Sequence, residues 1–308
     1  MKKNIIIKIL TSIAILFMII IPIIIAETME QKKDKTGIRT VEELLRDYEV
    51  YGDFIYEVVP AIENGYDQAV VIHKYIGTAT EIEIPEEING MKVIKIQGQA
   101  DLENGGFAKS VKRVYLPDCV RYIGAYAFAG SNVEYVHMYG STIIGDYAFA
   151  NCRNLETVDE AGGNFYSRGL ARGTKVGEGV FFNCVSLEYV ELPELEYLPE
   201  RFFEGCKSMS TVRFWDSFYA IGEGALRGCS GLTDIEFSPN ITTIDKDAFE
   251  GCSSLQDVEL PANLKKLENN AFKNCTSLIN VWMPKNVDMD KEAFYGCTAL
   301  REVQYYDK

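Results

Sequence analysis

The chain of 308 residues is 47% hydrophobic and carries a formal net charge of −14. This length and apolar content are sufficient for a large buried core. The acidic balance excludes the basic surface on which nucleic-acid binding depends, because lysine and arginine contacts to phosphate supply most of that affinity. We therefore expect no DNA or RNA partner.

The N-terminal segment differs in composition from the rest of the chain. Lysines precede an uncharged run from Ile9 to Ala26, which is longer than a usual signal-peptide core and just long enough to span a bilayer. Ala26 suits a cleavage site, whereas Ile24 is bulkier than the small residue preferred there. Residues 1–26 are predicted to be a signal peptide or an N-terminal membrane anchor, with the anchor favoured, and the polar residues 27–39 a linker. In both cases the remainder is placed outside the cytoplasm, extracellular or at the cell surface, and an uncleaved segment makes the membrane a partner.

The next segment is predicted to cap a larger domain. A capping-box pattern that starts at Thr40 predicts a helix ending near Gly52. Two strand-like runs, Phe54–Val59 and Ala69–Tyr75, flank a turn-rich stretch and predict a β-hairpin. A repeat stack needs a distinct end unit, so residues 40–79 are predicted to be a small helix-plus-hairpin cap.

From residue 80 the sequence repeats. Cys229, Cys252, Cys275 and Cys297 are spaced 23, 23 and 22 residues apart, each with a leucine three residues later. A fixed period in the twenties predicts a solenoid, because each unit must stack on its neighbours to bury its apolar side. An aromatic position recurs three residues before the cysteine position, at Phe107, Phe128, Phe149, Phe181, Phe203, Leu226, Phe249, Phe272 and Phe294. Residues 80–308 are therefore predicted to form about nine coils.

Each repeat contains one short alternation of apolar and polar residues, which predicts a strand. The inward pairs are predicted to be Val114 and Leu116, Val136 and Met138, Val190 and Leu192, Val212 and Phe214, Ile235 and Phe237, Val258 and Leu260, Val281 and Met283, and Val303 and Tyr305. A second apolar position, as in Ile221-Gly222, is predicted to close each coil through a tight turn. We expect one β-strand per coil on the concave face and one short convex turn.

The motif Ala-Phe-x-x-Cys-x-x-Leu-x-x-Val-x-Leu-Pro, complete in residues 248–261, resembles the BspA-like leucine-rich repeat surface protein family. The resemblance covers about residues 80–308, with Ser110 and Ser131 in place of cysteine in the early coils. It implies a curved leucine-rich repeat solenoid on an exported or surface protein that binds host or neighbouring macromolecules. No catalytic residue is shared within the family, so none is carried over.

Seven of the eight cysteines recur once per coil, which predicts core positions rather than an ordinary disulfide framework. Buried free thiols are favoured. Disulfides between adjacent coils and metal binding are the alternatives, although zinc sites usually contain closely spaced cysteine pairs. Cys119 lies outside the series and is expected to be more exposed. We expect no cofactor and no metal.

The chain lacks the common catalytic patterns. His73 and His137 are its only histidines, and no H-E-x-x-H, G-x-S-x-G or P-loop pattern occurs. A hydrolase on a solenoid scaffold would need a polar cleft around a histidine or clustered acids. We expect no enzyme activity.

The outward positions of the strands include both tryptophans and several tyrosines, which binding faces favour. The candidate ligand-binding residues on the concave face are Tyr115, Tyr135, His137, Tyr139, Tyr189, Trp215, Asp234, Glu236, Asp257, Glu259 and Trp282. The four carboxylates come from adjacent coils and would repel one another, which favours a basic segment or a cation above them. A merely solvated acidic sheet is the alternative.

One insertion interrupts the period. The interval from Cys152 to Cys184 is 32 residues, and residues 159–173 combine arginines, aromatic residues and glycines. This segment is interpreted as a tolerated surface loop or as a ligand contact at the rim of the concave face.

The sequence as a whole predicts an exported cell-surface protein that acts as a non-catalytic binding or adhesion module for a protein or glycan ligand. The alternative is a structural spacer or assembly module of the cell envelope without a dedicated ligand.

Overall fold

The structure is a computed structural model that describes residues 41–98, 107, 109–138, 142–160, 176–188, 190 and 195–307. The predicted signal peptide or anchor, the linker and residues 161–173 of the insertion lie outside these ranges. Among the described residues, none of the helices combines the length and the apolar composition needed to cross a membrane.

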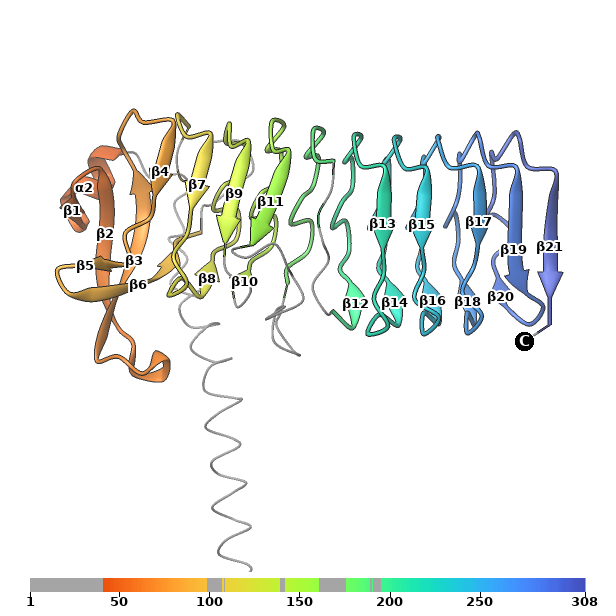
Figure 1. The fold of residues 1–308 in the computed structure, drawn as a ribbon, viewed down its shortest axis with the longest axis horizontal. Coiled ribbons are helices and arrows are strands. Elements are labelled where there is room, and N and C mark those ends of the chain that lie inside the picture. Colours follow the sequence, from red (N-terminus) through yellow and green to blue (C-terminus); the bar gives the residue numbers. More distant parts are fainter. Residues whose placement is uncertain are drawn as a thin grey trace, which may run out of the picture.

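The repeats form a solenoid of about nine coils, which stack side by side in a row from the cap to the C-terminal strand (Figure 1). The first ladder of strands consists of β4 (Glu81–Glu83), β7 (Arg113–Tyr115), β9 (Tyr135–Met138), β11 (Thr157–Glu160), β13 (Thr211–Arg213), β15 (Asp234–Glu236), β17 (Asp257–Glu259), β19 (Asn280–Pro284) and β21 (Glu302–Tyr306). Paired strands are parallel and in register: Val114 pairs with Val136, and Val136 pairs with Val158. Equivalent side chains therefore stack from coil to coil, as the period predicts.

The predicted inward positions of this ladder are buried in most described coils, including both members of the pairs that begin in β7, β9, β17 and β19. Ile235 and Phe237 are only half-buried. Tyr305 was expected to point into the core but is 52% exposed, because no described coil stacks beyond β21 to cover it. Periodicity therefore predicts the interior correctly except where a neighbouring coil is missing or less closely paired.

A second ladder, which the sequence pattern did not predict, runs along the stack. It consists of β6 (Met91–Ile96), β8 (Tyr122–Ile123), β10 (Ile143–Ile144), β12 (Tyr197–Leu198), β14 (Ala220–Ile221), β16 (Thr243–Ile244), β18 (Lys266–Leu267) and β20 (Asp288–Met289). The expectation of one strand per coil is wrong, since the second apolar position forms a strand of two residues in most coils. Such a strand is too short to show an alternating pattern in the sequence.

The cap contains the predicted hairpin but a shorter helix than expected. Helix α2 (Val41–Asp47) stops before Gly52, and β1 (Glu49–Tyr51) pairs with β2 (Phe54–Pro60) in antiparallel fashion. The valine and tyrosine of β1 are good strand formers, which favours this pairing over further helix. Strand β2 pairs with β3 (Gln68–Tyr75), and a short 3₁₀ helix (Ile62–Asn64) lies between them.

The cap is continuous with the second ladder. Strand β3 pairs with β6 in parallel, with Val70 opposite Val93, and β6 pairs with both β8 and the short strand β5 (Glu87–Ile88). Phe54 of the hairpin also stacks on Phe107 of the first coil, with ring centroids 6.4 Å apart. The cap thus covers the N-terminal end of the core.

Phenylalanine rings form a column through the core. The rings of Phe128 and Phe149 are stacked at 5.2 Å, and those of Phe249 and Phe272 at 4.9 Å. Leu226 interrupts the column, as the sequence predicts, and is fully buried. Ring stacking of this kind adds about 0.5–1.5 kcal/mol per pair beyond the burial of apolar area.

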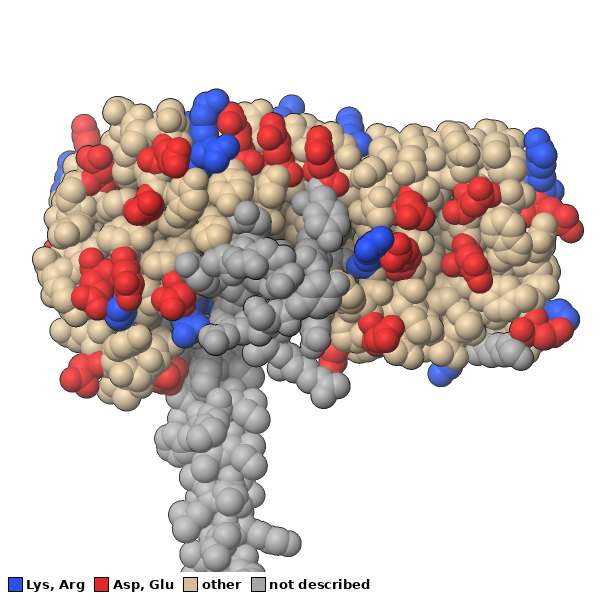
Figure 2. Space-filling view, in the orientation of Figure 1, with Lys and Arg blue, Asp and Glu red and all other residues tan. Residues whose placement is uncertain are grey.

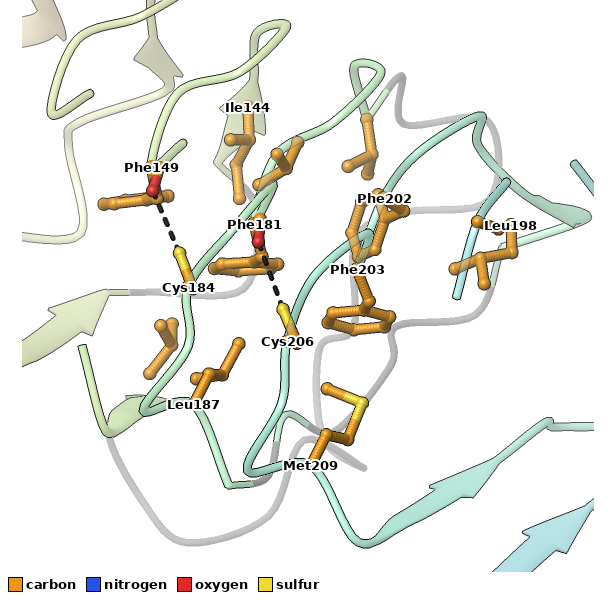
Figure 3. Packing of buried hydrophobic residues seen from close by; sticks show 14 of the residues in the cluster. Ile144, Phe149, Phe181, Cys184, Leu187, Leu198, Phe202, Phe203, Cys206 and Met209 are labelled. Carbon is orange, nitrogen blue, oxygen red and sulfur yellow. Dashed lines mark hydrogen bonds between the residues drawn. The ribbon is translucent and has the colours of Figure 1, made fainter. Parts of the chain in front are cut away.

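The seven repeated cysteines are free and act as hydrogen-bond donors across coils. Each thiol donates to the carbonyl at the phenylalanine position of the preceding coil, as Figure 3 shows for Cys184 with Phe149 and Cys206 with Phe181. The Sγ to oxygen distances are 3.0–3.3 Å throughout the series. The cysteine therefore satisfies a buried backbone acceptor as well as filling space.

Burial also controls the chemistry of these thiols. It raises the pKa of Cys229 to about 12, and it raises the pKa values of Cys206 and Cys252. Cys297 in the last coil is only half-buried. The expectation that Cys119 is exposed is wrong: it is 8% exposed, and its thiol donates to the carbonyl of Glu86 at 3.4 Å.

Candidate binding face

The side chains that point away from the core on the first ladder form one surface, which we name the strand face. In β9 the buried Val136 alternates with the half-buried Tyr135 and His137, in agreement with the predicted period of two. Tyr139 and Tyr189 lie outside the described residues. Seven of the remaining nine candidates form two groups along the stack, one aromatic and one acidic, and the other two are the tryptophans.

Aromatic side chains gather on β7 and β9. The ring of Tyr115 lies 5.8 Å from that of Tyr135 and 6.0 Å from that of His137, measured between centroids. The guanidinium carbon of Arg113 lies 5.3 Å from the centre of the Tyr135 ring. In-register pairing places Arg113 beside Tyr135 and Tyr115 beside His137, so backbone geometry makes these contacts. We name these four residues the aromatic cluster.

Acidic side chains gather on β15 and β17. All four carboxylates, from Asp234, Glu236, Asp257 and Glu259, are exposed. The two coils are neighbours, because the second ladder pairs β16 with β18. Pairing in the first ladder stops between β15 and β17, although it is present on both sides of this step. Like charges directly opposite one another destabilise strand pairing, which accounts for the break.

The repulsion expected from the sequence is partly relieved. Glu236 forms an ion pair of 2.9 Å with Arg213 of the preceding strand, and Asp257 accepts a hydrogen bond of 2.6 Å from the Asn280 amide. Asp234 and Glu259 have no ion-pair partner among the described residues. We name the four carboxylates the acidic patch. Acidic side chains are spread over this face of the molecule in Figure 2.

The two tryptophans have different roles. Trp215 is half-buried and packs against the hydrophobic core, although the sequence places it at an outward position of its strand. The indole N–H of Trp282 donates to Gln304 of the next strand at 2.8 Å. Trp282 remains a candidate contact on the strand face, whereas removal of Trp215 would also disturb packing.

A shallow pocket of about 300 Å³, which no sequence pattern predicted, lies at the N-terminal end of the strand face. Tyr51, Phe54 and Ile82 contribute apolar walls, and Glu81 and Glu83 of β4 contribute carboxylates. The pocket forms where the β1–β2 turn meets the first coil. Its parts are far apart in the sequence, so no local pattern could have shown it.

The two histidines lie in different parts of the described structure. His73 is buried in the cap, where its ring stacks on Tyr48 at 3.9 Å and its Nε2 lies 3.2 Å from a Glu57 carboxylate oxygen. His137 belongs to the aromatic cluster. In the part of the chain that the structure describes, no group of three or more histidine, cysteine or acidic side chains could hold a metal ion.

The repeat pattern also decides the family. The family model described as "BspA type Leucine rich repeat region" matches residues 100–164 and 174–305, in six copies. The chain belongs to this family. The gap between the two matched segments falls within the insertion, so the BspA-type repeats resume after it. No curated protein matches the sequence.

Several solved structures are similar to the chain. A leucine-rich repeat protein of T. pallidum, TpLRR, is 22% identical, with 83% of this chain and 92% of that chain covered and a TM-score of 0.43. A leucine rich cell surface protein from Faecalibacterium prausnitzii is 21% identical, with 85% and 95% covered and a TM-score of 0.39. The pneumococcal vaccine antigen PcpA is 15% identical, with 83% and 81% covered and a TM-score of 0.42. The family assignment rests on the repeat match alone.

Proposed function

We propose that this BspA-type protein is an exported cell-surface module that binds a protein or glycan ligand on its strand face and catalyses no reaction. The aromatic cluster is the observation that supports this proposal best. Its rings are half-buried, so each is held by its neighbours while one side stays accessible. Rings held in this way contribute contact area at a low entropic cost, which is why tyrosine is common at binding sites.

The acidic patch supports selection of the ligand. It retains net negative charge, because the four carboxylates face one guanidinium, that of Arg213. Exposed charges of this kind steer encounter and exclude like-charged partners more than they add affinity. A ligand with a basic segment therefore fits this surface better than an acidic one.

Export is supported by the sequence of the first 26 residues, in which lysines precede the uncharged run. Retention of this segment would hold the repeats at the cell surface. A spacer or assembly role is the second candidate.

The test is a screen of the full-length protein against an array of glycans and purified host proteins. For each probe that binds, the double variant Tyr115→Ala/Tyr135→Ala should weaken the affinity by about 1–3 kcal/mol per anchor. Tyr197→Ala is the matched control, because Tyr197 is 50% exposed on β12 of the second ladder.

Unchanged affinity in the double variant, with the fold intact by circular dichroism, would place the binding surface elsewhere. Absence of any binding probe would favour the spacer.

A further inference from the structure

Strand β4 is an edge strand of the first ladder, although described parts of the chain both precede and follow it (Figure 1). On one side it pairs with β7, with Ile82 opposite Val114. The cap strands β1, β2 and β3 belong to the other sheet, so no described strand pairs with the second side of β4. The first ladder therefore has a free edge at the junction between the cap and the first coil.

The backbone groups at this free edge are available for pairing. Alternate residues of a strand direct their N–H and C=O groups to opposite sides. Ile84 faces β7, since its N–H donates to the Tyr115 carbonyl at 2.9 Å. Glu81 and Glu83 therefore direct their backbone groups to the free edge, where no backbone group of the described residues pairs with them. An edge of this kind is a template for another strand.

The free edge borders the shallow pocket of about 300 Å³ beside β4, which we name the junction pocket. Phe54 and Tyr75 form one wall, where their ring centroids lie 5.3 Å apart. The Tyr75 hydroxyl also accepts a hydrogen bond of 3.2 Å from the Ala79 N–H. Tyr51 lines the pocket as well and is 45% exposed, so the aromatic wall reaches the surface. The wall is held by its own contacts, and the volume suits one or two side chains of a ligand.

Carboxylates give the junction pocket its charge. Asp53, Glu81 and Glu83 line it and are exposed, and none of the lining residues is basic. Arg113 lies opposite Glu81 in the ladder and offsets at most one of these charges. The remaining negative charge disfavours pairing of β4 with an uncharged or acidic segment and favours a basic one.

We propose that the junction pocket binds an extended polypeptide segment of a partner protein, which adds a strand to the free edge of β4 and places a lysine or arginine side chain in the pocket. Strand addition takes its affinity from main-chain hydrogen bonds and its selectivity from side-chain pockets. The backbone groups of Glu81 and Glu83 provide the first. The aromatic wall and the carboxylates provide the second, because both attract a cation.

This site goes beyond the ligand proposed for the aromatic cluster. The cluster lies on β7 and β9, on the paired side of β4, whereas the partner strand occupies the other side. Occupancy of one surface does not require the other.

Binding of a short peptide to the full-length protein in detergent tests the charge preference. The probe is acetyl-Thr-Val-Lys-Val-Thr-amide, in which β-branched residues favour an extended strand. Microscale thermophoresis with peptide concentrations up to about 1 mM measures the affinity. We expect saturable binding, and binding at least about tenfold weaker for the same peptide with glutamate in place of lysine.

Backbone methylation of the probe tests strand addition. Alternate N–H groups of a strand face the neighbouring strand, so methyl groups on one set of peptide nitrogens block pairing and those on the other set point away. One probe is N-methylated at both valines, and the other at the lysine and the last threonine. We expect one of the two to bind about tenfold weaker than the other.

A substitution in the protein tests the location. Glu83→Gln should weaken binding of the lysine probe about three- to tenfold, without altering the fold, because Glu83 is exposed. Glu302→Gln is the matched control, since Glu302 is an exposed carboxylate at an outward position of β21, at the far end of the same ladder. The control variant should bind as the unaltered protein does.

Absence of saturable binding or equal affinity for the lysine and glutamate probes would overturn the proposal. Equal affinities of the two methylated probes would exclude strand addition, and equal affinities of Glu83→Gln and Glu302→Gln would place the peptide elsewhere on the molecule. Either result would also overturn it.

Discussion

The inward and outward sides of the first ladder differ in how much they vary along the stack. The central inward residue is a buried valine in most described strands of this ladder, namely Val114, Val136, Val158, Val212, Val258 and Val281. The outward residue beside it is basic in β7, aromatic in β9, acidic in β15 and an amide in β19. Every interior coil must fill the same space, whereas the outer side meets only solvent or a ligand. Repetition therefore determines the fold, and departures from repetition on the outside indicate function.

The largest difference between the core and the exposed surface should appear in the reactivity of the buried thiols. Burial raises the pKa of Cys229 to about 12 from an ordinary value of about 9, which leaves roughly a thousandth as much thiolate at neutral pH. Alkylation of the native protein should therefore be slowed at least about a thousandfold at Cys229 relative to the denatured protein. The half-buried Cys297 should react first. Mass spectrometry of a time course checks both rates. Rapid labelling of Cys229 in the native state would contradict the conclusion that the repeated cysteine thiols are buried and protonated.

A charge introduced at one of the buried cysteine positions should have the next largest effect. Cys252 is 0% exposed, and its thiol donates to the Leu226 carbonyl at 3.3 Å. Cys252→Asp should lower the free energy of unfolding by about 3 kcal/mol or more, because a carboxylate cannot donate this bond and would be buried without a partner. Cys252→Ser is the control, since the buried Ser131 occupies the equivalent position in another coil. Urea unfolding that shows equal costs for both variants would contradict the account.

The repeated features of the fold were predictable because the same pattern of residues occurs many times in the sequence. The phenylalanine column, the cysteine ladder and the inward valines were all identified in this way. The second ladder was not predicted, because most of its strands are two residues long and such a strand shows no alternation of apolar and polar residues. The end of α2 and the burial of Cys119 depend on partners elsewhere in the chain, namely β2 and Glu86.

The candidate site was only partly predictable for the same reason. Period-two alternation placed Tyr115, Tyr135 and His137 on one face, and the structure shows them in contact. The pairing of Glu236 with Arg213 and the pocket beside β4 arise from neighbouring coils and from the cap. No repeat unit taken alone contains that information.

A smaller effect should separate the two tryptophans. Trp215→Ala should lower the free energy of unfolding by about 2 kcal/mol, because this indole packs against the core. Trp282→Ala should cost less than about 1 kcal/mol, since its hydrogen bond to Gln304 is exposed. Urea titrations of both variants measure the difference. Equal costs would mean that Trp215 is no more a part of the core than Trp282.

Two adjacent residues of β9 provide the most direct test of the division between the two sides. Val136 is 0% exposed, and Tyr135 next to it belongs to the aromatic cluster. The measurement is the free energy of unfolding and the affinity for one array-selected probe, determined side by side for Val136→Ala and Tyr135→Ala. Val136→Ala should lose about 2 kcal/mol of stability and bind as the unaltered protein does, whereas Tyr135→Ala should lose no more than about 1 kcal/mol of stability and about 1–3 kcal/mol of binding. Loss of binding in Val136→Ala with unchanged binding in Tyr135→Ala would contradict the assignment of function to the outward side.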